Sequence, residues 1–171
     1  MSAKACHEAL CAAGERLDPI LAPLGYVFEP DEMIPGVPLA TALFVRGKQA
    51  ININYSRSGT RLGVVMYVNA GGGMHHDQLM RALGLADRQL LAFEEAELRS
   101  FSHVGGDPID ALIADLTLAA PALQDPARMD ELIARNMERH AREHPKHAAH
   151  NHSDRKRSGR GRFGKRVPRD H

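Results

Sequence analysis

Residues 39–68 contain three β-prone runs separated by very short turns. The central run, residues 50–55, alternates strictly, so its isoleucines and tyrosine lie on one face of a strand and its asparagines on the other. Gly47 and Lys48 supply one turn, and residues 56–59 supply the next. A parallel return needs about a dozen residues or more, so such short connections require antiparallel neighbours. The segment therefore predicts a meander of three or four strands.

Helical patterns flank these strands. Good helix formers dominate residues 3–17, where Leu10 and Leu17 share a face, and Asp18 followed by Pro19 is expected to stop or bend the helix. Farther along, an aspartate followed by proline twice marks a helix start, because the aspartate caps the helix and proline suits its first turn. The sequence predicts further strands at residues 26–28 and 98–104, and helices at residues 74–83, 87–97, 108–119 and 126–143.

Together these patterns predict an α+β fold, a single antiparallel β-meander of about four strands with helices packed on one face. We expect the globular domain to span residues 1–144 and to end in a long amphipathic helix. Beyond Pro145 almost no apolar side chains remain to offset the entropy of ordering the chain. Residues 145–171 are therefore predicted to form a disordered tail rich in His and Arg.

Charge is divided unevenly between the two parts of the chain. Residues 139–171 hold eleven Lys and Arg and three acids, a formal excess of +8. Residues 1–138 hold eleven Lys and Arg and eighteen acids, a formal excess of −7. The net charge of +1 therefore hides an acidic body and a basic tail, a division typical of proteins that contact a polyanion.

The basic segment, residues 155–169, interleaves cations with Gly and Ser around one aromatic residue. Guanidinium groups match phosphate oxygens, and an aromatic ring can stack on an unpaired base. We predict that the segment contacts nucleic acid, RNA in preference to DNA, through Arg155, Lys156, Arg157, Arg160, Arg162, Phe163, Lys165, Arg166 and Arg169. Two alternatives stay open: the segment folds back on the acidic body, or it serves only to keep the protein soluble.

Histidines suggest two other sites. His140 and His144 stand one helical turn apart, a spacing that can chelate a divalent metal, and His147 could add a third ligand. Two alternatives also explain this run: the histidines act only as spacers, or they gain charge as the pH falls through about 6.5 and strengthen contact with anions. A second hypothesis groups His75, His76, Asp77 and His103 as a metal or catalytic cluster, because these side chains supply ligands, a base and an acid.

Several classes of protein are disfavoured by what the sequence contains. No window approaches the eighteen or so apolar residues of a membrane span, so we expect no membrane contact. The first residues meet charge before any long apolar run, which does not predict a signal peptide, and we expect a cytoplasmic protein. Gly71, Gly72 and Gly73 precede a predicted helix but lack the Lys-Ser or Lys-Thr of a phosphate-binding loop. We therefore expect no cofactor.

The leading hypothesis is a non-enzymatic protein whose basic tail binds nucleic acid electrostatically. The second is a protein-interaction module in which the sheet face or the last helix docks a protein partner and the tail is accessory. The third is a small metal protein or enzyme centred on the histidines. The sequence leaves the oligomeric state open.

Overall fold

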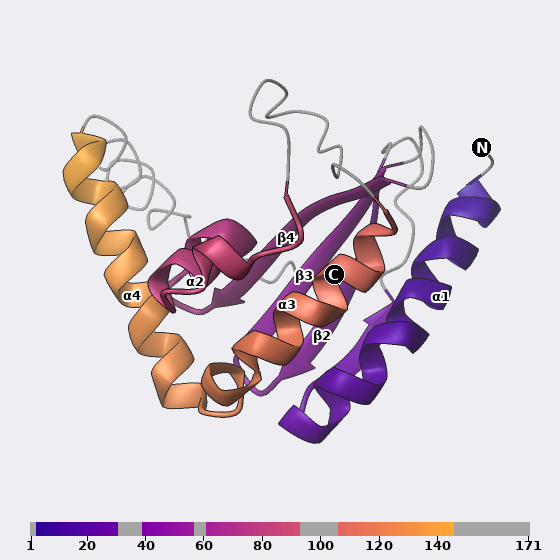
Figure 1. The fold of residues 1–171 in the computed structure, drawn as a ribbon, viewed down its shortest axis with the longest axis horizontal. Coiled ribbons are helices and arrows are strands. Elements are labelled where there is room, and N and C mark those ends of the chain that lie inside the picture. The colour runs from indigo at the N-terminus through magenta and orange to yellow at the C-terminus, as the bar shows by residue number, and fades with distance from the viewer. Residues whose placement is uncertain (1–2, 31–38, 57–60, 93–105, 146–171) are drawn as a thin grey trace, which may run out of the picture. The chain divides into compact units, whose positions relative to one another are not determined.

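A five-stranded antiparallel sheet forms the frame of the protein (Figure 1). The computed structural model describes residues 3–30, 39–56, 61–92 and 106–145. Strands that follow one another in the sequence are neighbours in the sheet, in the order β1-β2-β3-β4-β5. The strands are β1 (Val27–Pro30), β2 (Leu39–Arg46), β3 (Gln49–Ser56), β4 (Arg61–Asn69) and β5 (Gly72–His75). The predicted meander is confirmed.

The fifth strand was not predicted, because residues 71–73 looked like the break between sheet and helix. In the structure Asn69 closes a tight turn, since its side-chain oxygen accepts hydrogen bonds from the backbone N–H groups of Gly71 and Gly72 at 2.8 and 3.1 Å. The chain then returns along β4, where Gly73 lies opposite Val68. A β-carbon on Gly73 would lie 3.0 Å from the Val68 side chain, so glycine fits this position. Backbone pairing forms the strand here, and β-propensity contributes little.

Four α-helices complete the part of the chain that the structure describes: α1 (Ala3–Leu21), α2 (His76–Ala82), α3 (Pro108–Leu123) and α4 (Pro126–Glu143). The starts of α3 and α4 follow the two Asp-Pro signals as predicted. The first helix was expected to stop or bend at Pro19, and it does not stop there but continues to Leu21. Leu21 is fully buried, and its burial offsets the backbone hydrogen bond that a proline removes.

Two other predicted helices differ from those in the structure. The helix expected at residues 87–97 is replaced at its start by a short 3₁₀ turn, Ala86–Arg88, and residues 89–92 are not helical. The helix expected from residue 74 begins at His76, because β5 occupies the two residues before it. The strand expected at residues 98–104 lies outside the described residues, as does the predicted tail beyond residue 145.

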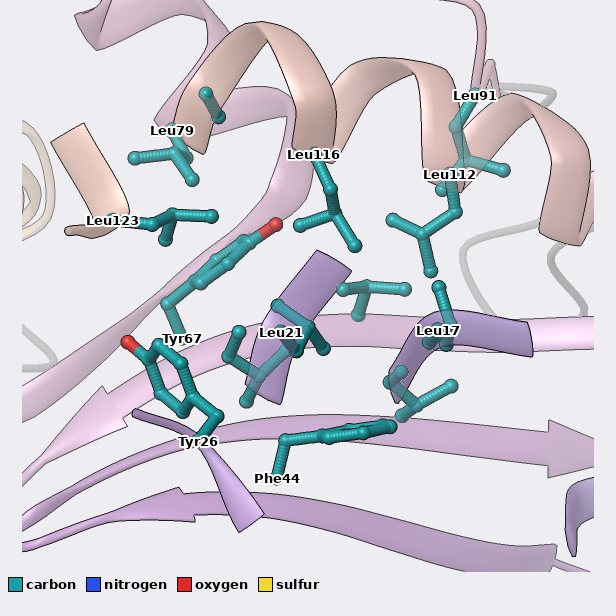
Figure 2. Close-up of a cluster of buried hydrophobic side chains, with 14 of the residues drawn as sticks. Leu17, Leu21, Tyr26, Phe44, Tyr67, Leu79, Leu91, Leu112, Leu116 and Leu123 are labelled. Carbon is teal, nitrogen blue, oxygen red and sulfur yellow. The ribbon is translucent and has the colours of Figure 1, made fainter. Parts of the chain in front are cut away.

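The core lies between one face of the sheet and the helices (Figure 2). Alternation along the strands places Phe44, Ile51 and Tyr67 side by side in one register row on this inner face. Leucines of α1 and α3 pack onto the row from above, and all four helices contribute buried side chains to the same cluster. Helices thus cover one face, as predicted. No helix among the described residues is long and apolar enough to cross a membrane.

Candidate functional site

Three polar side chains meet inside the core where the sheet, α2 and α3 converge. The Tyr67 hydroxyl lies 2.8 Å from Nδ1 of His76, and Nε2 of His76 lies 3.0 Å from a carboxylate oxygen of Asp115. The backbone N–H groups of Leu90 and Leu91 donate to the same carboxylate at 2.8 and 2.9 Å. We call Tyr67, His76 and Asp115 the polar triad.

Each member of the polar triad reaches the core for a local reason. Tyr67 belongs to the inner face of β4, in register with Ile51. His76 is the first residue of α2, where the chain leaves β5 and turns across the inner face. Asp115 lies within the apolar stripe of α3, between Leu112 and Leu116. An acid inside an apolar helical stripe was the one sequence signal for this site, and our sequence analysis missed it.

Burial and hydrogen bonding shift the pKa values of two members of the polar triad, Asp115 and Tyr67. Burial alone would raise the pKa of the Asp115 carboxyl, but hydrogen bonds from His76, Leu90 and Leu91 outweigh burial and hold the pKa below its usual range. Burial raises the pKa of the Tyr67 hydroxyl well above its ordinary value. A carboxylate can only accept, so Nε2 of His76 donates to it, and Nδ1 of the same ring hydrogen-bonds with the Tyr67 hydroxyl. Each polar side chain of the triad therefore has a hydrogen-bond partner inside the core.

The polar triad has the order of groups found in nucleophilic catalysis, a hydroxyl, an imidazole and a carboxylate. A catalytic hydroxyl must reach its substrate, however, and here the three residues are 1%, 1% and 0% exposed for Tyr67, His76 and Asp115. The arrangement therefore joins layers of the fold. It connects β4 to α2, α2 to α3, and α3 to the backbone at residues 90–91.

Replacing Tyr67 with Phe should lower the free energy of unfolding by about 1–2 kcal/mol, because Nδ1 of His76 would lose its hydrogen-bond partner inside the core. Urea unfolding followed by circular dichroism measures the loss. Tyr26→Phe is the matched control, since its buried ring lies against Arg46 and no hydroxyl hydrogen bond of Tyr26 is found among the described residues. Equal losses in the two variants would contradict the role given to the Tyr67 hydroxyl.

A second polar cluster joins the β2–β3 turn to the start of α4. Arg46 lies over the Tyr26 ring at 4.3 Å and donates to the backbone oxygens of Leu24 and Leu123. Gln49 donates to the Asp130 carboxylate at 2.8 Å, and Asn69 donates to the same oxygen at 2.7 Å. These hydrogen bonds hold the pKa of Asp130 below its usual range. Arg46 therefore holds the end of α3 against the sheet, and Asp130 holds the start of α4 against it.

The side chains of His75, His76 and Asp77, which were predicted to form one cluster, lie in different environments. His75 is exposed at the end of β5, whereas His76 is buried in the polar triad. Asp77 pairs with Arg81 on the surface of α2, with 3.7 Å between nitrogen and oxygen. His103 lies outside the described residues.

The predicted histidine pair is present on α4. His140 and His144 are both exposed, and their ring centroids are 4.8 Å apart. His147, the suggested third ligand, lies outside the described residues. Within the described parts of the chain no group of three or more His, Cys, Asp or Glu side chains is placed to hold a metal ion.

The predicted nucleic-acid-binding segment, residues 155–169, also lies outside the described residues. The chain matches no protein-family model, no curated protein and no solved structure in the three comparisons. Function must therefore be inferred from the residues of this chain and from their geometry.

Proposed function

We propose that this is a non-enzymatic binding protein that contacts nucleic acid electrostatically through residues 155–169. The observation that carries the proposal is the separation of charge, +8 in residues 139–171 and −7 in residues 1–138. Cations that neutralise phosphates release condensed counterions, and this release supplies affinity without requiring a shaped pocket.

Five arginines of the folded body support this division, because they already form hydrogen bonds or ion pairs within the body. Arg16 bridges Asp107 and Asp110 of α3 at 2.8 and 2.6 Å. Arg46 is held in the cluster with Gln49 and backbone oxygens. Arg81, Arg128 and Arg135 pair with acids on their own helices. These contacts engage five arginines of the described body, and the proposal therefore assigns phosphate contact to the cations of residues 139–171.

Single-stranded RNA suits the basic segment better than duplex DNA. Phe163 stands among the cations, and aromatic rings contribute to binding by stacking on unpaired bases. Glycines and serines between the arginines resemble the spacing of segments that bind RNA without reading its sequence. The acidic body repels the same polyanion, which directs the nucleic acid toward the basic segment.

Deleting residues 146–171 should abolish retention of a single-stranded RNA at about 100 mM salt, because the deletion removes the excess of positive charge. The measurement is fluorescence anisotropy of a labelled oligonucleotide. A full-length control that carries Gln at the eight Lys and Arg positions of residues 155–169 should lose binding equally, since it keeps the length but removes the charge. Equal retention by the intact and shortened proteins would refute the proposal.

A second candidate, a protein-interaction module, has one observation in its favour. The face of the sheet opposite the helices carries apolar side chains that none of the described helices covers. This observation favours the sheet face over the last helix as the surface that would dock a protein partner.

A further inference from the structure

The sheet has an outer face opposite the core. Strand alternation assigns to it the partly exposed Leu43, Val45, Ala50, Met66 and Val68, together with Val27, which is 63% exposed. The four described helices all contribute to the core on the other side, so none of them lies on the outer face. A contiguous apolar sheet surface of this kind is typical of an interface.

Register divides the outer face into two rows that cross all five strands. The first row, from β1 to β5, is Val27, Val45, Ala50, Val68 and Gly73. The second row is Glu29, Leu43, Asn52, Met66 and His75. The first row contains no polar side chain. The second has an acid at one edge, an imidazole at the other and a carboxamide in the middle.

We propose that the outer face binds the outer face of a second copy of this chain, about a two-fold axis parallel to β3. Such an axis places each row opposite the same row of the other copy, with the order of the strands reversed, so that β1 faces β5 and β2 faces β4. Glu29 then faces His75 at both edges. Leu43 faces Met66, and Asn52 meets its own counterpart on the axis.

Complementarity between opposite ends of each row favours a second copy over an unrelated partner. An acid at the β1 edge would meet an imidazole from the β5 edge, which can donate a hydrogen bond to a carboxylate. In the first row the protruding Val27 would face Gly73, beside which the Val68 and Met66 side chains lie, so the contact would be apolar. Polar edges thus meet polar edges, and apolar side chains meet apolar side chains.

Asn52 provides an independent indication. Its side-chain oxygen is buried and has no hydrogen-bond partner among the described residues. A carboxamide carries both a donor and an acceptor, so two of them that meet on a two-fold axis can satisfy each other after a turn of the side chain. A single polar residue at the centre of an apolar interface also fixes its register.

The size of the face is sufficient for a reversible dimer. Five strands about 4.8 Å apart span roughly 24 Å, and the longest strand extends about 28 Å. Because β1 and β5 are only four residues long, the footprint is smaller than a rectangle of these dimensions, about 500 Å² on each copy, below the roughly 800 Å² per partner of a standard stable interface. Two aligned sheets packed about 10 Å apart would form a sandwich with the helices on its outer sides.

Sedimentation velocity of the full-length protein tests the proposal. At about 100 µM the intact chain should sediment as a dimer, and Val45→Asp should raise the dimer dissociation constant at least about tenfold, because it places a charge in the apolar row. Leu90→Asp is the matched control, since Leu90 is 58% exposed on the helical side, and it should leave the dimer unchanged. A monomeric intact chain, a larger assembly, or an unaltered Val45→Asp dimer would overturn the proposal.

A charge exchange tests the orientation and does not depend on whether Val45→Asp folds. Glu29→Lys and His75→Glu should each weaken the dimer about threefold, since each places like charges or unmatched groups at both edges. The double variant restores opposite charges and should return the dissociation constant to the value of the intact chain. Additive weakening in the double variant would rule out this two-fold arrangement. Neither measurement involves nucleic acid. The proposed function can therefore be refuted while the dimer is confirmed, and the dimer can be refuted while the proposed function is confirmed.

Discussion

Raising the salt concentration from about 50 to about 200 mM is expected to weaken binding of single-stranded RNA by roughly a thousandfold. Residues 155–169 carry eight Lys and Arg. If all of them neutralise phosphates of a single strand, log affinity falls with log salt at a slope of about −5. Because the body has a formal excess of negative charge and four of its arginines are paired with its own acids, the slope should come mainly from this segment.

A graded series sharpens that measurement. Replacing four of the eight cations with Gln should reduce the slope to about half, since each neutralised phosphate contributes about −0.7. Phe163→Leu should lower affinity at every salt concentration and leave the slope unchanged, because stacking releases no counterions. Anisotropy titrations at four or five salt concentrations provide the data. A slope near zero in the intact protein would exclude electrostatic tethering.

Replacing Asp115 with Ala should lower the free energy of unfolding by about 3–5 kcal/mol, the largest effect on stability that we expect from one side chain. The carboxylate accepts hydrogen bonds from His76 and from the backbone N–H groups of Leu90 and Leu91. All three donors would lose this acceptor inside the core, and unpaired buried donors are costly. Since domains of this size are stable by only about 5–15 kcal/mol, the variant should be close to unfolding.

Asp110→Ala is the matched control for Asp115→Ala, because Asp110 is an aspartate of the same helix with a side chain that is 73% exposed. It pairs with Arg16 across the protein surface, and its removal should change stability by less than about 1 kcal/mol. Urea unfolding of the two variants separates a buried carboxylate from a surface one. Losses of similar size would show that the polar triad contributes no more than a surface ion pair.

The pH dependence of stability is set by the direction of the Asp115 pKa shift. The folded protein holds the pKa of this carboxyl below its usual range, so the unfolded chain takes up the proton more readily. The carboxylate therefore stabilises the fold fully above about pH 4 and progressively less as the pH falls through the folded-state pKa. Asp115→Ala should lose less stability than the intact protein as the pH falls below about 4. Asp107 and Asp130, whose pKa values are also lowered, are present in both proteins.

Much of the fold could be predicted because its signals are local. Period-two alternation in residues 50–55 and the short turns on either side required an antiparallel meander, and Asp107 and Asp125 marked the starts of α3 and α4. The errors occurred where tertiary contacts override local preference. Burial of Leu21 carries α1 past a proline, and pairing with β4 makes a strand from glycines that local rules assign to a turn.

The internal site was largely beyond sequence reasoning. His75 and His76 are adjacent and chemically identical, yet one is exposed and the other is enclosed with Asp115, which lies 39 residues farther along the chain. Asp115 carried only the weak signal of an acid in an apolar stripe. Partners that distant are brought together by the packing of α3 over the sheet, which no local pattern encodes.

The amino-acid sequence by itself determined the class of fold, the order of its central strands and the division of charge between body and tail, because periodicity, turn chemistry and charge are properties of short segments. Only the tertiary structure decided that His76 is a buried structural group, that five arginines of the body are engaged within it, and that two register rows cross the outer face of the sheet. Those outcomes depend on which distant residues become neighbours, and this is set by the packing of the helices and the register of the strands.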